Sequence, residues 1–184
     1  AIAGCEGINV FTPDDSIGGA DVTGPVLIFD DDHYHIGGVI AELLRNQNLD
    51  VTLVTPATEV STWTQNTLEQ HRIQSRLMEL GIDIVTSQNL SAIHPDHVEL
   101  RCVYTDRVTE RTAANVVLAT MRLPNEELYQ SLIESDNVTR IGDALAPATI
   151  ANAVYAGHRF ARELDEPAHN GVPFKRELAE LGDF

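Results

Sequence analysis

Lysine is almost absent from this chain, and the overall charge is strongly negative. Lys175 is the only lysine among 184 residues, and 28 acidic residues against 12 basic ones give a net charge of −16. A nucleic-acid backbone and an anionic membrane surface both repel such a charge, so neither is expected as a partner. The chain also lacks the long apolar run of a membrane span and a basic-plus-apolar signal at its start. The sequence therefore predicts a cytoplasmic location.

Cysteine is scarce as well. Cys5 and Cys102 stand far apart, and neither belongs to a Cys-x-x-Cys pair. This spacing argues against a disulfide framework and gives no ligand set for zinc or for an iron–sulfur cluster. No Ser-His-Asp or Cys-His set can be assembled from the sequence either. We therefore predict no catalytic residue and no metal ligand in this chain.

The first residues carry few structural signals. The stretch from Ala1 to Phe11 has no initiator methionine and no clear periodicity. We therefore expect the chain to be part of a longer polypeptide. Residues 1–23 are predicted to form an extended lead-in, in which Thr12 caps a short helix that ends at Gly18.

Apolar residues make up 43% of the chain, and their spacing predicts an α/β fold. An uninterrupted apolar run opening at Val26 is typical of a strand buried on both faces. From there to residue 86, segments whose apolar residues have helical spacing alternate with short apolar segments typical of strands. The predicted elements are strands at 26–30, 51–55 and 82–86 and helices at 36–47 and 64–80. Right-handed crossovers make these strands parallel.

The pattern then changes to short alternating segments at 90–94, 98–104 and 107–112, which predict an antiparallel meander. We expect this meander to cover one face of the parallel sheet, where a helix would otherwise lie. Residues 115–120 return as another buried strand.

Beyond a break at 121–125, the remaining elements are predicted to be a helix at 126–133, a strand at 137–143 and a helix at 147–164. The inward face of the last helix is predicted to consist of Ile150, Val154, Phe160 and Leu164.

The turn after the first buried strand carries acidic residues where a dinucleotide-binding turn has glycines. Its sequence is Asp30-Asp31-Asp32-His33-Tyr34-His35. Carboxylates there would repel a pyrophosphate by about 1 kcal/mol per charge pair even in water. We favour a dinucleotide turn that no longer binds its nucleotide. A divalent-cation site that includes His33 and His35 and a plain acidic surface loop remain alternatives, whereas a phospho-receiver is disfavoured because the third strand ends without an aspartate.

Gly142-Asp143 is a second candidate site, at the predicted turn into the helix that Pro147 opens. A strand, a Gly-Asp turn and a helix N-terminus can bind a diphosphate, with the aspartate accepting a hydrogen bond from a ribityl or ribose hydroxyl. The alternative is an ordinary strand–helix turn in which Asp143 acts as a cap.

Five motifs occur in order along the chain. They are Asp32-His33-Tyr34 with Gly37-Gly38, Asp50-Val-Thr-Leu-Val-Thr-Pro56, Trp63-Thr-Gln-Asn-Thr-Leu-Glu69, Ile141-Gly-Asp-Ala-Leu-Ala-Pro147 and Ala156-Gly-His-Arg-Phe-Ala-Arg-Glu163. Together they resemble the C-terminal, nucleotide-binding-like region of trimethylamine dehydrogenase-like enzymes, over residues 10–178. Those enzymes are flavin, iron–sulfur oxidoreductases of the old yellow enzyme and 2,4-dienoyl-CoA reductase superfamily.

The resemblance implies a Rossmann-like, three-layer FAD/NAD(P)-binding fold with a parallel sheet and an antiparallel meander, plus a partial second nucleotide-binding module. Residues 24–120 would form an NAD(P)-domain-like module, and residues 121–184 would complete an FAD/ADP-binding-like module. Gly142 and Asp143 fall on the family motif that contacts ADP or FAD, so they are the predicted cofactor-binding residues.

The resemblance also has implications for function. In such enzymes FMN, the 4Fe–4S cluster and the catalytic residues belong to a barrel domain, and nothing in this chain matches them. The expected partners are that barrel, an electron-transferring flavoprotein and further copies in a homo-oligomer. NADPH-dependent members keep the glycines, so the aspartates favour the amine-dehydrogenase branch. We therefore predict a non-catalytic, structural C-terminal portion of an amine or N-methyl amino acid dehydrogenase. The alternatives are a fragment of an NADPH-dependent enoate or dienoyl-CoA reductase and an independent metal- or protein-binding module.

Overall fold

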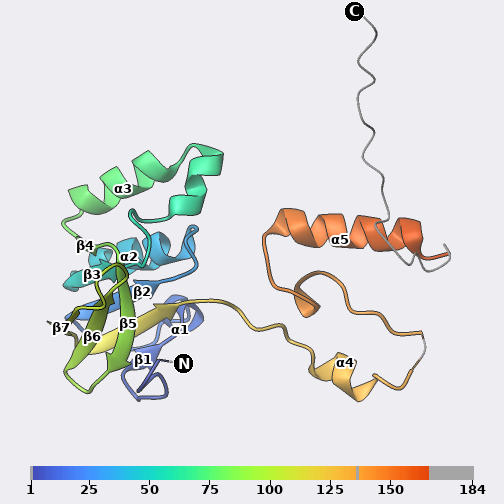
Figure 1. The fold of residues 1–184 in the computed structure, drawn as a ribbon, viewed down its shortest axis with the longest axis horizontal. Coiled ribbons are helices and arrows are strands. Elements are labelled where there is room, and N and C mark those ends of the chain that lie inside the picture. Colours follow the sequence, from blue (N-terminus) through green and yellow to red (C-terminus); the bar gives the residue numbers. More distant parts are fainter. Residues whose placement is uncertain (1, 136, 166–184) are drawn as a thin grey trace, which may run out of the picture. The chain divides into compact units, whose positions relative to one another are not determined.

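The computed structural model describes residues 2–135 and 137–165. The chain divides into two compact units, Ala1–Met121 and Arg122–Phe184, and Figure 1 shows their elements. The first unit holds two sheets and the helices α1 to α3, and the described part of the second holds α4 and α5. No helix within these described ranges has the length and apolar character needed to cross a bilayer.

The central element of the first unit is a five-stranded sheet with parallel pairing throughout. Its strand order is β1 (Val10–Phe11), β8 (Asn115–Ala119), β2 (Val26–Asp30), β3 (Val51–Val54) and β4 (Asp83–Val85). Every residue of β2 is buried, as expected for an apolar strand with neighbours on both edges and cover on both faces. The predicted parallel strands are confirmed.

One face of this sheet is covered by the helices α2 (Ile36–Asn46) and α3 (Gln70–Glu79). Val26 and Ile28 point to this face, since alternate residues of a strand point to opposite sides. They share one apolar core with Ile40 and Leu44 of α2 and with Leu77 of α3. Burial of such side chains contributes about 1.5–3 kcal/mol each, so the helical spacing read from the sequence fixes which face α2 presents.

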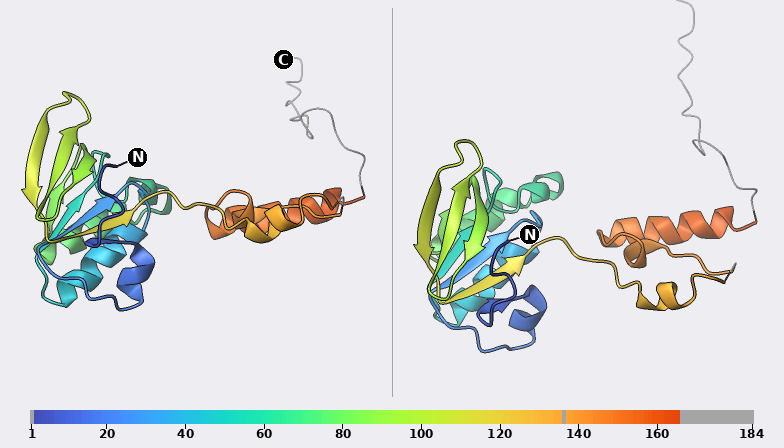
Figure 2. Two further views of the ribbon diagram at one scale, coloured as in Figure 1. Left: turned by 90° about the horizontal axis from the view of Figure 1, so that it is seen from below. Right: turned by 60° about the horizontal axis from the view of Figure 1, so that its bottom comes forward.

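The opposite face is covered by an antiparallel sheet of β5 (Gln88–Ile93), β6 (His97–Cys102) and β7 (Val108–Thr112). Leu27 and Phe29 of β2 pack in a second apolar core with Leu90 of β5 and Leu100 of β6. Figure 2 shows these strands in green on one side of the parallel sheet, with α2 on the other. The predicted meander and its covering role are confirmed.

The predicted helix at 64–80 is wrong in one respect, because the chain forms two helices there. A 3-10 helix, η1 (Thr62–Thr67), is separated from α3 by Leu68, whose φ of 63° lies in the left-handed region. The Thr64 hydroxyl donates to the Ser61 carbonyl at 2.7 Å, and the Thr67 hydroxyl donates to the Thr64 carbonyl at 3.0 Å. Such side-chain bonds to the backbone compete with the hydrogen bonds of a regular α-helix. The apolar residues therefore keep a helical spacing across 64–80 although the backbone forms two separate helices.

Residues 1–23 were expected to be an extended lead-in with one short helix; the structure contains that helix, α1 (Pro13–Ile17), and also the strand β1, which was not predicted. Thr12 caps this helix as predicted, in a reciprocal pair of bonds with Asp15: its hydroxyl accepts from the Asp15 N–H at 3.1 Å, and the Asp15 carboxylate accepts from the Thr12 N–H at 2.8 Å. The predicted end at Gly18 is also confirmed. Pairing of β1 with β8 gives the segment its place in the sheet.

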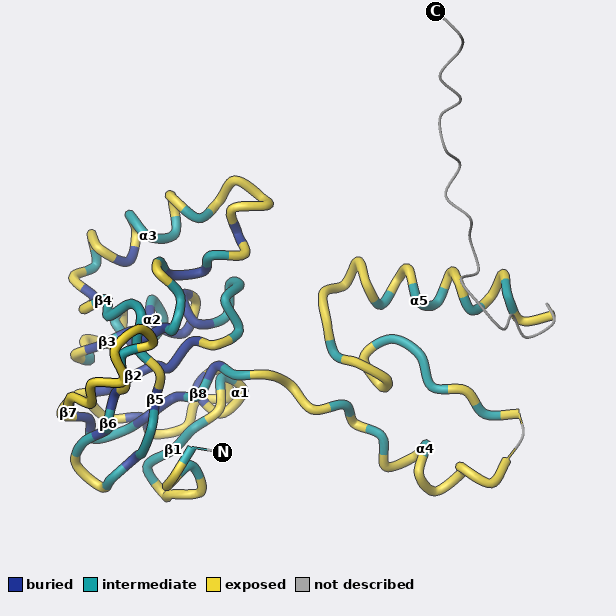
Figure 3. The backbone as a smooth tube through the Cα atoms, in the orientation of Figure 1, coloured by how far each residue is buried: buried dark blue, intermediate teal, exposed yellow. Residues whose placement is uncertain are grey.

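The second unit contains α4 (Glu127–Ser131), a 3-10 turn η2 (Gly142–Ala144) and α5 (Ile150–Glu163). The predicted strand at 137–143 is wrong, because the described part of this unit offers no other strand to pair with it. The predicted inward face of α5 is also wrong: Ile150 is 84% exposed and Val154 is 65% exposed. Figure 3 shows no buried position in the described part of this unit. Its apolar residues have no covering layer there.

Candidate functional site

The carboxyl ends of parallel strands are the usual ligand-binding edge of an α/β sheet. At this edge β2 ends in Asp30, whose side chain is fully buried. One carboxyl oxygen, Oδ1, accepts the backbone N–H groups of Asp32 and His33, both at 3.2 Å. In the described part of the chain the other oxygen, Oδ2, is buried without a hydrogen-bond partner. Asp30 is therefore an internal carboxyl group rather than part of a solvated acidic loop.

Asp30 lies against the first turn of α2. A Cβ atom placed on Gly37 would lie 2.4 Å from Cγ of Asp30 and 2.5 Å from its Oδ2, distances too short for any side chain. Glycine at this position therefore gives room to the carboxyl group. A dinucleotide-binding fold uses the same place, at the N-terminus of the helix after the first strand, for a phosphate. In this chain the buried carboxyl group of Asp30 lies beside the first turn of that helix.

Burial raises the pKa of Asp30 to about 6, because the ionised carboxylate loses its water shell, while the backbone N–H of His33 opposes this by binding the charged form. The group therefore changes its charge between mildly acidic and neutral pH. In either charge state it takes up space beside Gly37, and the charged state also repels an approaching phosphate.

The two histidines of the acidic turn do not act together. His33 Nε2 lies 3.2 Å from Asp31 Oδ1, whereas His35 Nε2 lies 3.2 Å from Glu69 Oε2, on a different element. On an extended loop, residues 33 and 35 would point to the same side, but His33 has a left-handed φ of 60°, so the loop is not extended there. Residues 2–135 and 137–165 contain no group of three or more metal-ligating side chains placed to hold one ion. The geometry thus gives no support to the divalent-cation alternative.

Gly142 and Asp143 lie in the turn before α5. Gly142 has a left-handed φ of 56°, a conformation that favours glycine. Asp143 Oδ1 accepts the backbone N–H of Ala148 at 3.3 Å, so its carboxylate orders the loop that leads into the helix. The cap alternative is wrong in this form, because the N-cap of α5 is Thr149 and Ala148 lies before it. The side chain is nevertheless exposed, and the predicted cofactor contact stays a prediction.

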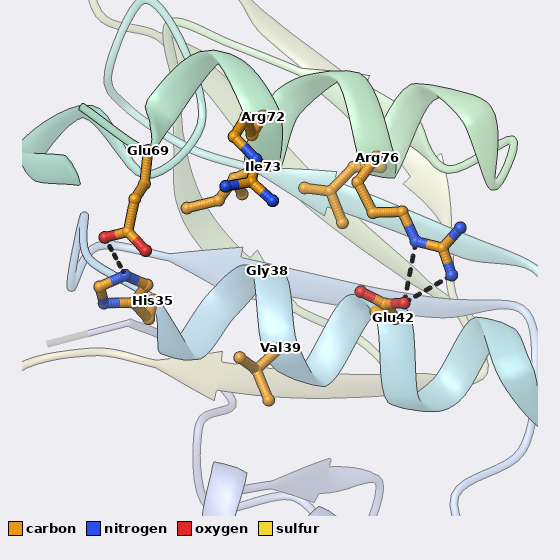
Figure 4. Close-up of a pocket in the computed structure, with 9 residues that line it drawn as sticks. His35, Gly38, Val39, Glu42, Glu69, Arg72, Ile73 and Arg76 are labelled. Atoms are coloured by element: carbon orange, nitrogen blue, oxygen red, sulfur yellow. Dashed lines mark hydrogen bonds and ion pairs between the residues drawn. The ribbon is translucent and has the colours of Figure 1, made fainter. Parts of the chain in front are cut away.

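A groove between α2 and α3 was missed at the level of sequence. It has a volume of about 360 Å³, and Figure 4 shows the side chains that line it. The lining residues are His35, Gly38, Val39, Glu42, Glu69, Arg72, Ile73, Arg76 and Leu77. The one available signal was the spacing of Glu69, Arg72 and Arg76, which places acidic and basic groups along one side of α3. The Asp30–Gly37 contact was also missed, because the sequence does not state how close strand and helix approach.

Comparison with known proteins identifies the family. Residues 11–126 match the OYE-like second alpha/beta domain, and the chain belongs to this family. It is 29% identical over 204 residues to dimethylamine dehydrogenase of Hyphomicrobium sp. (strain x), covering 95% of this chain and 27% of that protein. The chain therefore spans about a quarter of the length of this relative.

Two solved structures are similar in both fold and sequence. Histamine dehydrogenase from Rhizobium sp. 4-9 is 40% identical with a TM-score of 0.86, over 95% of this chain and 29% of that one. The 6-hydroxypseudooxynicotine amine oxidase from Pseudomonas geniculata N1 is 35% identical with a TM-score of 0.79, over 86% of this chain and 25% of that one. The chain is thus similar to one part of enzymes that act on amines.

Proposed function

We propose that this chain is a non-catalytic portion of a flavin-dependent, iron–sulfur amine or N-methyl amino acid dehydrogenase. Its first unit would serve as a structural, Rossmann-like domain whose nucleotide turn is closed. The observation that carries this proposal is the buried carboxyl group of Asp30 against Gly37, in the position where an NADPH-binding domain would receive a phosphate. The similarity to histamine and dimethylamine dehydrogenases supports it independently.

The closed turn separates this proposal from that of an NADPH-dependent reductase. A pyrophosphate at a helix N-terminus needs close backbone approach and no competing negative charge. At this turn Asp30 fills the space, and the exposed carboxylate of Asp31 lies on the same loop. To bind here, NADPH would have to displace the Asp30 carboxyl group and accept the nearby charge of Asp31. Each would cost about 1 kcal/mol or more of binding free energy.

The second unit is proposed to contact ADP or FAD through Gly142 and Asp143. The glycine has no side chain to block a ligand, and one oxygen of the exposed Asp143 carboxylate is engaged with Ala148. The second oxygen could accept a hydrogen bond from a ribose or ribityl hydroxyl. The N-terminus of α5, a helix of 14 residues, begins a few positions further on and favours anions such as a diphosphate.

The proposed partners follow from the exposed apolar residues of the second unit. Ile150 and Val154 would be covered by other parts of a parent polypeptide that carries the FMN- and 4Fe–4S-binding barrel. An electron-transferring flavoprotein and further copies in a homo-oligomer are the other proposed partners, and the cytoplasm is the proposed location.

Calorimetric titration of the chain with ADP and with FAD tests the proposed contact. We expect saturable binding that is lost in Asp143→Ala and kept in Glu134→Ala, which removes an exposed acidic side chain from the same unit. Binding that is equally strong in both variants would rule out Gly142-Asp143 as the contact. A parallel titration with NADPH distinguishes the reductase alternative, since saturable NADPH binding would favour it.

A further inference from the structure

The groove between α2 and α3 has an apolar floor. Gly38 and Val39 of α2 and Ile73 and Leu77 of α3 line it, and Figure 4 shows Ile73 on the side of α3 that faces α2. A Cβ atom on Gly38 would lie 3.4 Å from Cγ2 of Ile73, an ordinary van der Waals distance, so the two helices are in packing contact at this point. Val39 is 53% exposed, which leaves apolar surface open to a ligand. The volume of about 360 Å³ falls within the range of small-molecule sites.

Each end of the groove is crossed by a polar contact that involves a carboxylate. At one end His35 Nε2 lies 3.2 Å from Glu69 Oε2. At the other, Arg76 donates two hydrogen bonds to Glu42 Oε1, at 2.9 Å and 2.7 Å. Glu42 and Glu69 are thus both engaged across the groove, Glu42 by an arginine and Glu69 by a histidine.

Arg72 lies between these two pairs. Figure 4 shows its guanidinium pointing toward the gap between the helices, above Ile73. Among the residues that the structure describes, no carboxylate forms an ion pair with it and no hydrogen bond from its side chain is found. A guanidinium presents a planar set of donors that matches a carboxylate in a two-point contact.

We propose that this groove binds a small organic monocarboxylate, with the carboxylate on Arg72 and an aromatic or branched apolar body over Val39 and Ile73. A monocarboxylate fits better than a phosphate, because a dianion would lie between Glu42 and Glu69 and would leave the apolar floor uncovered. The proposal does not depend on the nucleotide turn or on Gly142-Asp143, so it stands apart from the proposed function.

The test uses phenylacetate as the probe and the full chain as the protein, with binding followed by calorimetry or ligand-observed NMR. We expect saturable binding that weakens by about tenfold or more in Arg72→Gln, the loss expected for a charge-assisted contact. Arg101→Gln is the matched control, since it removes an exposed arginine from β6 and should leave binding unchanged.

A second variant and a second probe complete the test. Val39→Glu adds a carboxylate to an exposed position of the floor and should also abolish binding, while circular dichroism verifies that each variant is folded. The neutral analogue 2-phenylethanol should bind at least about tenfold more weakly than phenylacetate. No saturable binding of phenylacetate to the wild-type chain overturns the proposal. Equal affinity in the Arg72→Gln and Arg101→Gln variants, or equal affinity for the neutral analogue, does so as well.

Discussion

A Cβ atom placed on Gly37 would lie 2.4 Å from Cγ of Asp30, so the glycine in the first turn of α2 and the aspartate that ends β2 depend on each other. A side chain at position 37 would collide with the carboxyl group, and the carboxyl group fills the space in which a phosphate would otherwise approach the helix. This single contact is the observation on which the proposed closed nucleotide turn rests.

Replacing Gly37 by alanine should destabilise the first unit. The added methyl group has no free space beside Asp30, and overpacking of this kind costs about 1–3 kcal/mol. Urea unfolding followed by circular dichroism measures the loss. The neighbouring Gly38→Ala is the control, because its added Cβ would meet only ordinary contacts and alanine favours a helix over glycine by about 1 kcal/mol. Equal stability of the two variants would argue against a tight Asp30–Gly37 contact.

Replacing Asp30 by asparagine should change how stability depends on pH. Because the folded-state pKa is raised from 3.8 to about 6, the folded chain binds the proton more tightly than the unfolded chain does. The protonated carboxyl therefore stabilises the fold at low pH, and this contribution is lost as pH rises from about 4 to about 6, by on the order of 3 kcal/mol.

Asp30→Asn should therefore be more stable than the wild type at pH 7 and should show a flatter profile between pH 4 and pH 6. Urea unfolding across this range measures both effects. Asp21→Asn removes the same charge from an exposed position and serves as the reference. A profile of Asp30→Asn that is parallel to that of Asp21→Asn would show that Asp30 is not a buried titrating group.

Two stacked histidines flank the turn between β5 and β6, and the titration of one of them, His97, is a third prediction. His94 and His97 have ring centroids 4.3 Å apart, and His97 Nδ1 lies 2.8 Å from Asp96 Oδ1. This hydrogen bond raises the pKa of His97 above its ordinary value. NMR titration should show a decrease of that pKa in Asp96→Asn, whereas Asp21→Asn should leave it in place. If the pKa of His97 is unchanged in Asp96→Asn, the hydrogen bond to Asp96 does not stabilise the protonated form of His97.

The sequence was sufficient for the layers of the first unit. The apolar run of β2 and the helical spacing of α2 each specify one buried face, and the alternation of β5 to β7 specifies a half-buried sheet. Each of these patterns lies within a single helix or strand, and the structure has the predicted element at each place. The break at Leu68 was not predictable in this way, because the hydroxyl bonds of Thr64 and Thr67 interrupt a helical pattern without changing its spacing.

The candidate site was predicted in part. The sequence placed acidic residues where glycines were expected, but it could not distinguish an exposed cluster from one buried carboxyl group. That distinction depends on how closely β2 and α2 approach, which is a tertiary relationship. The same limit explains the failed strand at 137–143 and the exposed Ile150 of α5, since both predictions required partners that the described residues do not supply.

The measurement that tests the central claim most directly is a calorimetric titration of the full chain with NADPH, with ADP alongside it. The closed turn of Asp30 and Gly37 predicts no saturable binding of NADPH, whatever ADP does in the second unit. Saturable NADPH binding whose affinity changes with a substitution in the turn itself, such as Asp31→Ala, would contradict it, because the nucleotide would then lie at the turn that the Asp30 carboxyl group is proposed to close.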